Sequence, residues 1–103
     1  MESQMLHGTL EMCILYQFLS GDYYGYDVMS KMKVYFPDVK DSAFYVILRR
    51  LHAGGYTEVY YGEQSNGSQR KYYTITAAGR EYLQRCIDSW KEINSIIEDI
   101  GIG

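Results

Sequence analysis

The stretch that decides the fold is DSAFYVILRRLHAGGY, residues 41–56. Its apolar residues recur at i, i+3, i+4 and i+7, the spacing that gives an α-helix one buried face. These residues are Phe44, Ile47, Leu48 and Leu51. The opposite face carries Tyr45, Arg49, Arg50 and His52. Gly54 and Gly55 end the helix, because glycine readily adopts the left-handed conformation common at helix ends. The stretch therefore predicts a short helix with a basic outer face.

A β-hairpin is predicted directly after this helix. Residues 56–61 and 70–76 are rich in aromatic and β-branched side chains and predict its two strands. Between them lies Ser65-Asn66-Gly67-Ser68, in which Asn-Gly is a strong signal for a hairpin turn. Arg70 and Lys71 follow that turn, where a wing would meet phosphates, although a solvated hairpin tip would look the same. A basic helix followed by a basic hairpin is typical of a winged helix-turn-helix, whose helix enters the major groove.

Two further helices are predicted before this unit. Residues 5–19 are predicted to form a helix that is apolar on almost every face. Such a helix must be packed against other elements on two sides. The second of these sides is predicted to be covered by another subunit. A second helix is predicted from about residue 25 to 35, ended by Phe36-Pro37. Asp41 or Ser42 is the predicted cap of the next helix. Ser42 could equally donate to a phosphate there.

A long helix over residues 77–100, capped by Thr76, closes the chain. Its apolar residues follow the 3-4 spacing of a coiled-coil seam, which predicts that it dimerises with a symmetry mate. The predicted dimerisation residues are Leu83, Cys86, Trp90, Ile93, Ile97 and Ile100. The predicted fold is therefore α+β and mainly α, a winged helix-turn-helix with a two-stranded wing and a long C-terminal dimerisation helix. Residues 1–76 form its DNA-binding part, including the N-terminal helix, and residues 77–103 its dimerisation helix, within one compact domain.

The charge distribution favours nucleic acid as a partner although the net charge is −3. Residues 31–71 hold seven basic and four acidic residues, or +3, and this segment contains the predicted helix and hairpin. Local positive charge matters more than net charge for binding a polyanion. The chain has no basic signal peptide and no apolar run of membrane-spanning length, so a cytoplasmic protein without membrane contact is expected.

The DNA-binding prediction rests on helix 41–53 and the hairpin. The candidate DNA contacts are Lys40, Ser42, Tyr45, Arg49, Arg50, Arg70 and Lys71. Arg49 could instead pair with Glu58 or Asp41. The predicted function is a dimeric transcriptional regulator that binds double-stranded operator DNA. The alternative is a winged-helix module that binds protein and not DNA, for which a neutral or acidic helix and wing would be expected.

The lone tryptophan, Trp90, predicts a ligand site at the dimer axis, because two indoles in a seam would hold the helices apart. The predicted lining residues are Met12, Tyr16, Leu83, Cys86, Ile87, Trp90 and Asn94. A planar aromatic or cationic ligand would fit between two indole rings at such a site. The alternative is that both indoles simply fill the core. The two cysteines are expected to be buried free thiols, with a redox switch as the alternative.

No catalytic, metal or cofactor constellation is present in the sequence. His7 and His52 lie in different elements without a third ligand at metal spacing, and no Gly-rich phosphate loop follows a strand. The chain is therefore not expected to be an enzyme, and neither a metal nor a cofactor is predicted.

Several motifs together resemble PadR-type transcriptional regulators along essentially the whole chain. They are Tyr24-Gly25-Tyr26, Phe44-Tyr45, Leu48-Arg49-Arg50-Leu51, Gly55-Tyr56, Arg70-Lys71-Tyr72-Tyr73 with Thr76, and Gly79-Arg80-Glu81. The single C-terminal helix resembles the short subfamily, and Ser89-Trp90 with Ile96-Ile97-Glu98 is similar to its lactococcal multidrug-resistance regulator. The resemblance implies a homodimeric repressor with DNA contacts at Tyr45, Arg70 and Lys71. Ser42-Ala43 stands where the family usually has Gly-Thr, which changes the surface expected to face the groove.

Overall fold

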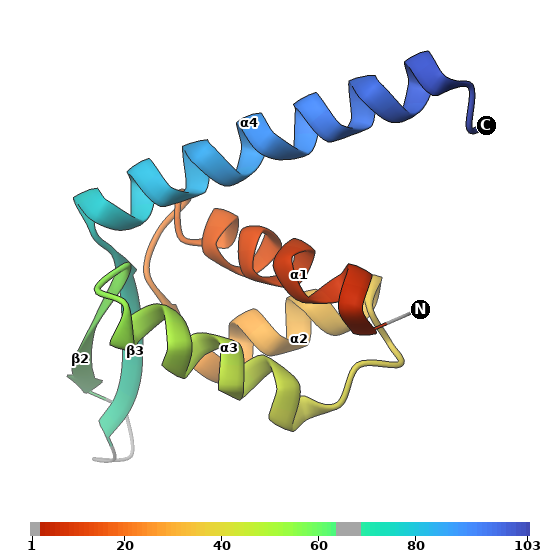
Figure 1. Ribbon diagram of the computed structural model, residues 1–103. Helices are drawn as coiled ribbons and strands as arrows, with labels where there is room; N and C mark the ends of the chain where they lie inside the picture. The colour runs from red at the N-terminus through yellow and green to blue at the C-terminus, as the bar shows by residue number, and fades with distance from the viewer. Residues whose placement is uncertain (1–2, 64–68) are drawn as a thin grey trace.

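The computed structural model describes residues 3–63 and 69–103 and shows a mainly helical chain with a small antiparallel sheet (Figure 1). Helices α1, α2 and α3 pack together, the sheet lies at one end of them, and α4 crosses over α1 and extends beyond it (Figure 1). The elements in chain order are α1 (Ser3–Gln17), β1 (Tyr23–Tyr24), α2 (Gly25–Tyr35), α3 (Asp41–Ala53), β2 (Thr57–Glu63), β3 (Gln69–Ile75) and α4 (Ala77–Ile100).

The predicted helices and hairpin strands are present, with small shifts of their ends. Helices α2, α3 and α4 have the predicted bounds. Helix α1 ends at Gln17 rather than at residue 19, because the chain continues as a turn in which the Phe18 N–H donates to the Leu15 carbonyl. The hairpin strands run over 57–63 and 69–75 instead of 56–61 and 70–76. The predicted turn Ser65-Asn66-Gly67-Ser68 lies outside the described residues.

The sheet contains a third strand that the sequence did not predict. Strand β1 pairs antiparallel with β3, so the strand order is β1-β3-β2. In this register Tyr24 lies opposite Tyr72, and Tyr72 lies opposite Tyr60. A strand of two residues is too short to show any alternation in the sequence. Its effect is to tie the start of α2 to the wing.

The core lies between the first three helices, β3 and the first turns of α4. Its buried apolar residues come from every helix: Leu6, Leu10, Ile14, Leu15, Phe18, Val28, Met29, Met32, Phe44, Ile47, Leu48, Leu51, Tyr73 and Leu83. Contacts of α1 with α2, α3 and α4 show that α4 of the same chain supplies part of the second cover of α1. Part of the cover that was predicted to come from another subunit therefore comes from the same chain.

The N-terminus of α3 differs from the prediction. The N-cap residue is Lys40, and no side chain makes a capping hydrogen bond there, so neither Asp41 nor Ser42 is the cap. Asp41 is the first helical residue and accepts a hydrogen bond from Lys33 Nζ at 2.6 Å. This ion pair joins the last turn of α2 to the first turn of α3. Asp41 is therefore paired with Lys33 and not with Arg49, the pairing that the sequence left open as an alternative.

Three hydrogen bonds made by Thr76 hold the junction between the wing and α4. As predicted, Thr76 caps α4, and its Oγ1 accepts from the Gly79 N–H at 2.9 Å. The same hydroxyl donates to the Gly55 carbonyl at 2.7 Å, and the Thr76 N–H donates to the Tyr56 carbonyl at 3.1 Å. Gly55 has a φ of +80°, a conformation that favours glycine. These bonds fix the direction in which α4 leaves the sheet.

Candidate DNA interface and ligand cavity

A recess of about 260 Å³ lies where the start of α2, the outer face of α3 and strand β3 meet. Two cationic side chains and several tyrosines line it: Tyr24, Gly25, Tyr26, Tyr45, Arg49, Lys71 and Tyr73. The structure thus brings together Tyr45, Arg49 and Lys71, which the sequence proposed separately from the helix and the hairpin. The resulting surface offers two positive charges and several hydroxyl donors, the groups that contact nucleic-acid phosphates.

Close packing of tyrosine rings shapes this recess. Gly25 opens α2, and a Cβ there would stand 3.3 Å from the Tyr73 ring, so a side chain at this position would make that ring shift by a few tenths of an ångström. Tyr45 is half-buried, and desolvation is the main cause that raises the pKa of its phenol. Its hydroxyl therefore stays protonated at neutral pH and can donate to an acceptor.

Tyr24 and Tyr26 belong to this recess but were not among the predicted site residues. They were noticed only as part of a motif that suggested the family, because nothing in their spacing distinguishes a recess wall from ordinary packing. Tyr24 also contacts the wing, where the Arg70 guanidinium lies 4.8 Å from the centre of its ring. Tyr24 is brought to the site by the unpredicted strand β1, and Tyr26 follows it in the first turn of α2.

The two wing cations lie on opposite faces of the sheet. Arg70 and Lys71 are consecutive in β3, and successive side chains of a strand point to opposite faces. Lys71 is on the side of buried Tyr73, 5.4 Å from its ring centre, and faces the recess. Arg70 lies on the other side with Tyr24 and Tyr72. Only Lys71 therefore lines the recess, while Arg70 flanks it.

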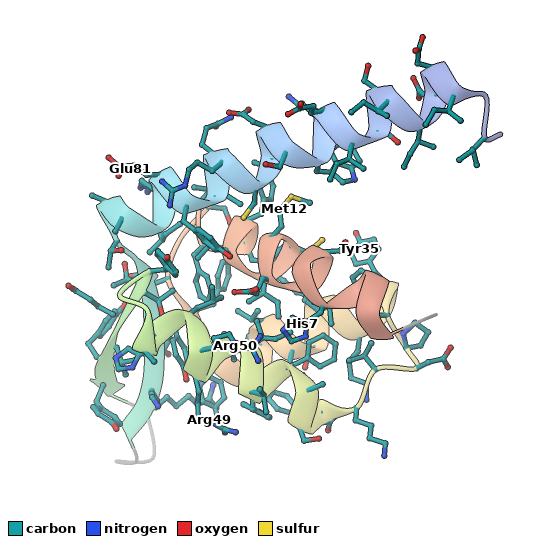
Figure 2. The ribbon with its side chains drawn as sticks, in the orientation of Figure 1. His7, Met12, Tyr35, Arg49, Arg50 and Glu81 are labelled. Atoms are coloured by element: carbon teal, nitrogen blue, oxygen red, sulfur yellow. The ribbon has the colours of Figure 1, made fainter. Side chains whose placement is uncertain are left out.

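The remaining predicted DNA contacts lie away from the recess. Arg50 turns from α3 toward α1 and contacts the ring of His7, whereas Arg49 projects from α3 on the far side from α1 (Figure 2). Lys40 and Ser42 are exposed at the start of α3. They line a separate, largely apolar cavity of about 470 Å³ between α1 and α3. The seven predicted residues therefore fall into two groups on α3 and the wing.

A second cavity, of about 460 Å³, lies between α1, α2 and α4. Four of the predicted ligand-site residues line it, namely Met12, Tyr16, Ile87 and Trp90. The lining residues that the sequence missed are Cys13, Gln17, Met32, Tyr35 and Phe36. Met32, Tyr35 and Phe36 come from α2 and its C-cap. The sequence missed them because the helical spacing of α1 and α4 does not show which other helix packs against the pair. In Figure 2, Met12 points from α1 toward α4.

Three predicted lining residues do not reach this cavity. Leu83 is only 2% exposed and belongs to the chain's own core. Cys86 is half-buried beside Tyr82, whose pKa is raised to about 12, chiefly by desolvation. Asn94 is exposed one turn beyond Trp90 and is not part of the wall. The wall of this cavity is largely apolar, and its amide group comes from Gln17 instead of Asn94.

Both cysteines are free thiols and half-buried. Burial raises the pKa of the Cys13 thiol above its ordinary value, so it stays protonated at neutral pH and forms an apolar part of the cavity wall. Within residues 3–63 and 69–103, no three His, Cys, Asp or Glu side chains are grouped as a metal site would require. No helix in the same residues combines the length and apolar character needed to cross a membrane.

Comparison with known proteins identifies the family. The sequence profile of the transcriptional regulator PadR-like family matches residues 14–85, well over half of the chain. This chain belongs to the PadR-like family of transcriptional regulators. The matched part of this PadR-like regulator includes α2, α3 and the wing, and thus the whole recess.

Related proteins cover nearly all of this PadR-like regulator. It is 34% identical to a PadR-like transcriptional regulator of known structure from Bacillus cereus, covering 98% of this chain and 99% of that one, with a TM-score of 0.85. A PadR family transcription regulator from Clostridium difficile is 25% identical with a TM-score of 0.81, covering 91% of this chain and 98% of that one. An uncharacterised protein of Lysinibacillus sphaericus is 33% identical over 93% of this chain and 91% of its own length.

The fold of this PadR-like regulator is therefore that of a DNA-binding transcriptional regulator, and the long C-terminal helix is present as predicted. Regulators of this family are generally not enzymes. The second half of α4 lies beyond the matched stretch. There the predicted seam is largely open to solvent, with Trp90 50%, Ile93 57%, Ile97 37% and Ile100 68% exposed. Leu83 is buried in the same chain, so it has no surface left for a dimer seam.

Proposed function

We propose that this PadR-like regulator is a cytoplasmic homodimeric repressor that binds pseudo-palindromic operator DNA and releases it when a small planar aromatic or cationic ligand binds. The observation that carries the proposal is the recess in which Arg49 and Lys71 converge with Tyr45 and the tyrosines that open α2. Charged and hydroxyl donors on one surface suit phosphates and base edges. Residues 1–76 would form the DNA-binding part and residues 77–103 the dimerisation helix.

The recess also suggests how the contacts are divided. Lys71 in the recess and Arg70 on the opposite face of the wing would hold the phosphate backbone on two sides of the sheet. Arg49 and Tyr45, on the outer face of α3, would face the major groove. Arg50 is turned toward His7, and Lys40 and Ser42 lie at the other end of α3, so these three would support the complex from its edge.

A dimer is supported by the exposed apolar surface of α4. Trp90, Ile93, Ile97 and Ile100 lie along one side of the helix, and Tyr16 of α1 is 55% exposed near them. Contiguous apolar surface of this kind marks an interaction site in a monomeric fold. A second copy of the chain would cover it by helix-on-helix packing.

Removing the two wing cations tests the DNA interface. Arg70→Ala together with Lys71→Ala should weaken binding to every duplex by about tenfold or more, since hydrogen bonds to charged groups each contribute roughly 1.5–3 kcal/mol. The slope of log affinity against log salt should flatten by about 0.9 for each phosphate that the variant no longer neutralises. Fluorescence anisotropy with a labelled promoter fragment over a range of salt concentrations measures both quantities.

A matched variant separates local contacts from total charge. Arg85→Ala with Lys91→Ala removes the same charge from exposed positions farther along α4, away from the wing. It should keep the wild-type salt slope. If the wing variant binds the promoter as tightly as wild type, the wing does not contact DNA and the interface proposal fails.

Trp90 allows the ligand part of the proposal to be tested directly. It is the lone tryptophan and lines the cavity between α1, α2 and α4. A cavity of this size and apolar character is typical of small-molecule sites. Titration with N-phenyl-1-naphthylamine, a neutral aromatic dye, should quench Trp90 fluorescence with a saturable curve and weaken operator binding.

The control for this titration is N-acetyltryptophanamide, whose fluorescence should fall only linearly with dye concentration. The same titration is repeated with flat aromatic cations, because the proposed ligand is either a planar aromatic or a cationic molecule. Absence of saturable quenching by every compound, or quenching without any change in DNA affinity, would leave a repressor without the proposed inducer.

A further inference from the structure

The wall of the ligand cavity includes the end of helix α2. Met32 and Tyr35 lie in its last turn, and Phe36 follows directly. Tyr35 is 73% exposed, whereas Met32 is only 3% exposed and belongs to the core. Met32 therefore forms the boundary between the cavity and the packed interior. A guest in the cavity would contact α2 as well as α1 and α4.

The end of α2 is connected to α3 in two ways. Met32 lies in the same buried cluster as Phe44, Ile47 and Leu48 of α3. Lys33, the neighbour of Met32, is ion-paired with Asp41 in the first turn of α3 at 2.6 Å. The linking segment is short, and within it the Val39 N–H donates to the Phe36 carbonyl at 3.1 Å. The last turn of α2 is thus linked to α3 through the core, an ion pair and a short connection.

We propose that a ligand in this cavity acts on DNA binding through α2: it displaces the end of α2, and α3 moves with it because of the shared core and the Lys33–Asp41 ion pair. This inference rests on the proposed function. A ligand shifts an equilibrium only if it interacts differently with the two states, and the contacts with Met32, Tyr35 and Phe36 supply that difference. Contacts with α1 and α4 alone would bind the ligand without displacing the end of α2.

The route is tested by the coupling factor, the ratio of operator dissociation constants with and without saturating N-phenyl-1-naphthylamine. Factors for coupled sites are typically about 5 to 150. Tyr35→Leu alters the α2 wall, and Tyr16→Leu is its matched control on the α1 wall. Both residues are exposed lining tyrosines, at 73% and 55%. Tyr35→Leu should lower the factor at least about threefold. Tyr16→Leu should leave it unchanged at saturation.

The ion pair gives a second, smaller effect. Lys33→Gln keeps a long polar side chain and removes the charge. The two side chains are 38% and 59% exposed, so solvent screens the pair, and its contribution amounts to at most about a fivefold change. The coupling factor should therefore fall about two- to fivefold in Lys33→Gln, while dye affinity, measured by Trp90 quenching, stays the same.

A variant that needs no dye tests the same route. Ile87→Trp places a larger side chain in the cavity from α4, and Ser95→Trp adds the same group at an exposed position of α4 outside both the cavity and the predicted seam. With folding confirmed by circular dichroism, Ile87→Trp should weaken operator binding at least about threefold by mimicking occupancy, whereas Ser95→Trp should not.

The outcomes separate the inference from the proposed function. If the dye fails to bind wild type, the inducer part of the proposed function fails, and the comparison of Ile87→Trp with Ser95→Trp alone decides the inference. Equal coupling factors in wild type, Tyr35→Leu and Lys33→Gln would overturn the route through α2. A folded Ile87→Trp variant with wild-type DNA affinity would overturn it as well.

Discussion

Replacing Ile93 and Ile97 together with lysine should convert the protein from a dimer into a folded monomer. These side chains are 57% and 37% exposed in the single chain and take no part in its buried core, so the fold itself should persist. Four charges brought together at a two-fold seam would repel and would also need desolvation. Sedimentation velocity at micromolar concentration should show dimer for wild type and monomer for the variant.

Loss of the dimer should also remove most of the operator affinity. Two linked half-sites gain about 10²- to 10⁴-fold over one, so binding should fall by at least about 100-fold. Gln84→Lys with Ser95→Lys adds the same charge to exposed positions of α4 outside the seam and should remain dimeric. A wild-type protein that sediments as a stable monomer would contradict the dimer, as would a lysine variant that stays dimeric.

Gly79→Ala should strongly destabilise the protein. A Cβ at this position would stand 2.0 Å from the Tyr56 carbonyl oxygen and 2.8 Å from Ile75 Cγ1. The carbonyl cannot retreat freely, because it accepts the hydrogen bond from the Thr76 N–H. Overpacking of this kind costs roughly 1–3 kcal/mol or more, and here α4 would also lose its cap, worth about 1 kcal/mol.

The opposing gain from alanine in a helix is only about 1 kcal/mol, so the net loss should be roughly 2 kcal/mol or more. Gly8→Ala is the matched control, since no atom of the described residues outside its own helix backbone lies within 4 Å of a Cβ at that position in α1. It should be neutral or stabilising by up to about 1 kcal/mol. Urea unfolding at one fixed protein concentration measures both variants, and a Gly79→Ala protein as stable as wild type would contradict the packing described for this junction.

The sequence predicted the helices well because their signals are local. The apolar spacing in residues 41–53, the cap at Thr76 and Phe36-Pro37 after α2 all act within one or two turns. Basic residues in helix and hairpin likewise identified the kind of partner, since residue type and chain order are sufficient for that inference. The cap of α3 was the local exception, because Asp41 bonds to Lys33, eight residues earlier in the chain, rather than to its own backbone.

The tertiary structure alone decided which residues share a site. Helical spacing placed Arg49 and Arg50 on one polar face, yet packing turns Arg50 toward His7 and leaves Arg49 in the recess. Strand β1 brings Tyr24 to the recess, and α2 completes the ligand cavity with Met32, Tyr35 and Phe36. Whether residues of different elements line the same recess or cavity depends on how those elements are oriented relative to one another. Sequence periodicity specifies the buried face of each element but not the neighbour that covers it.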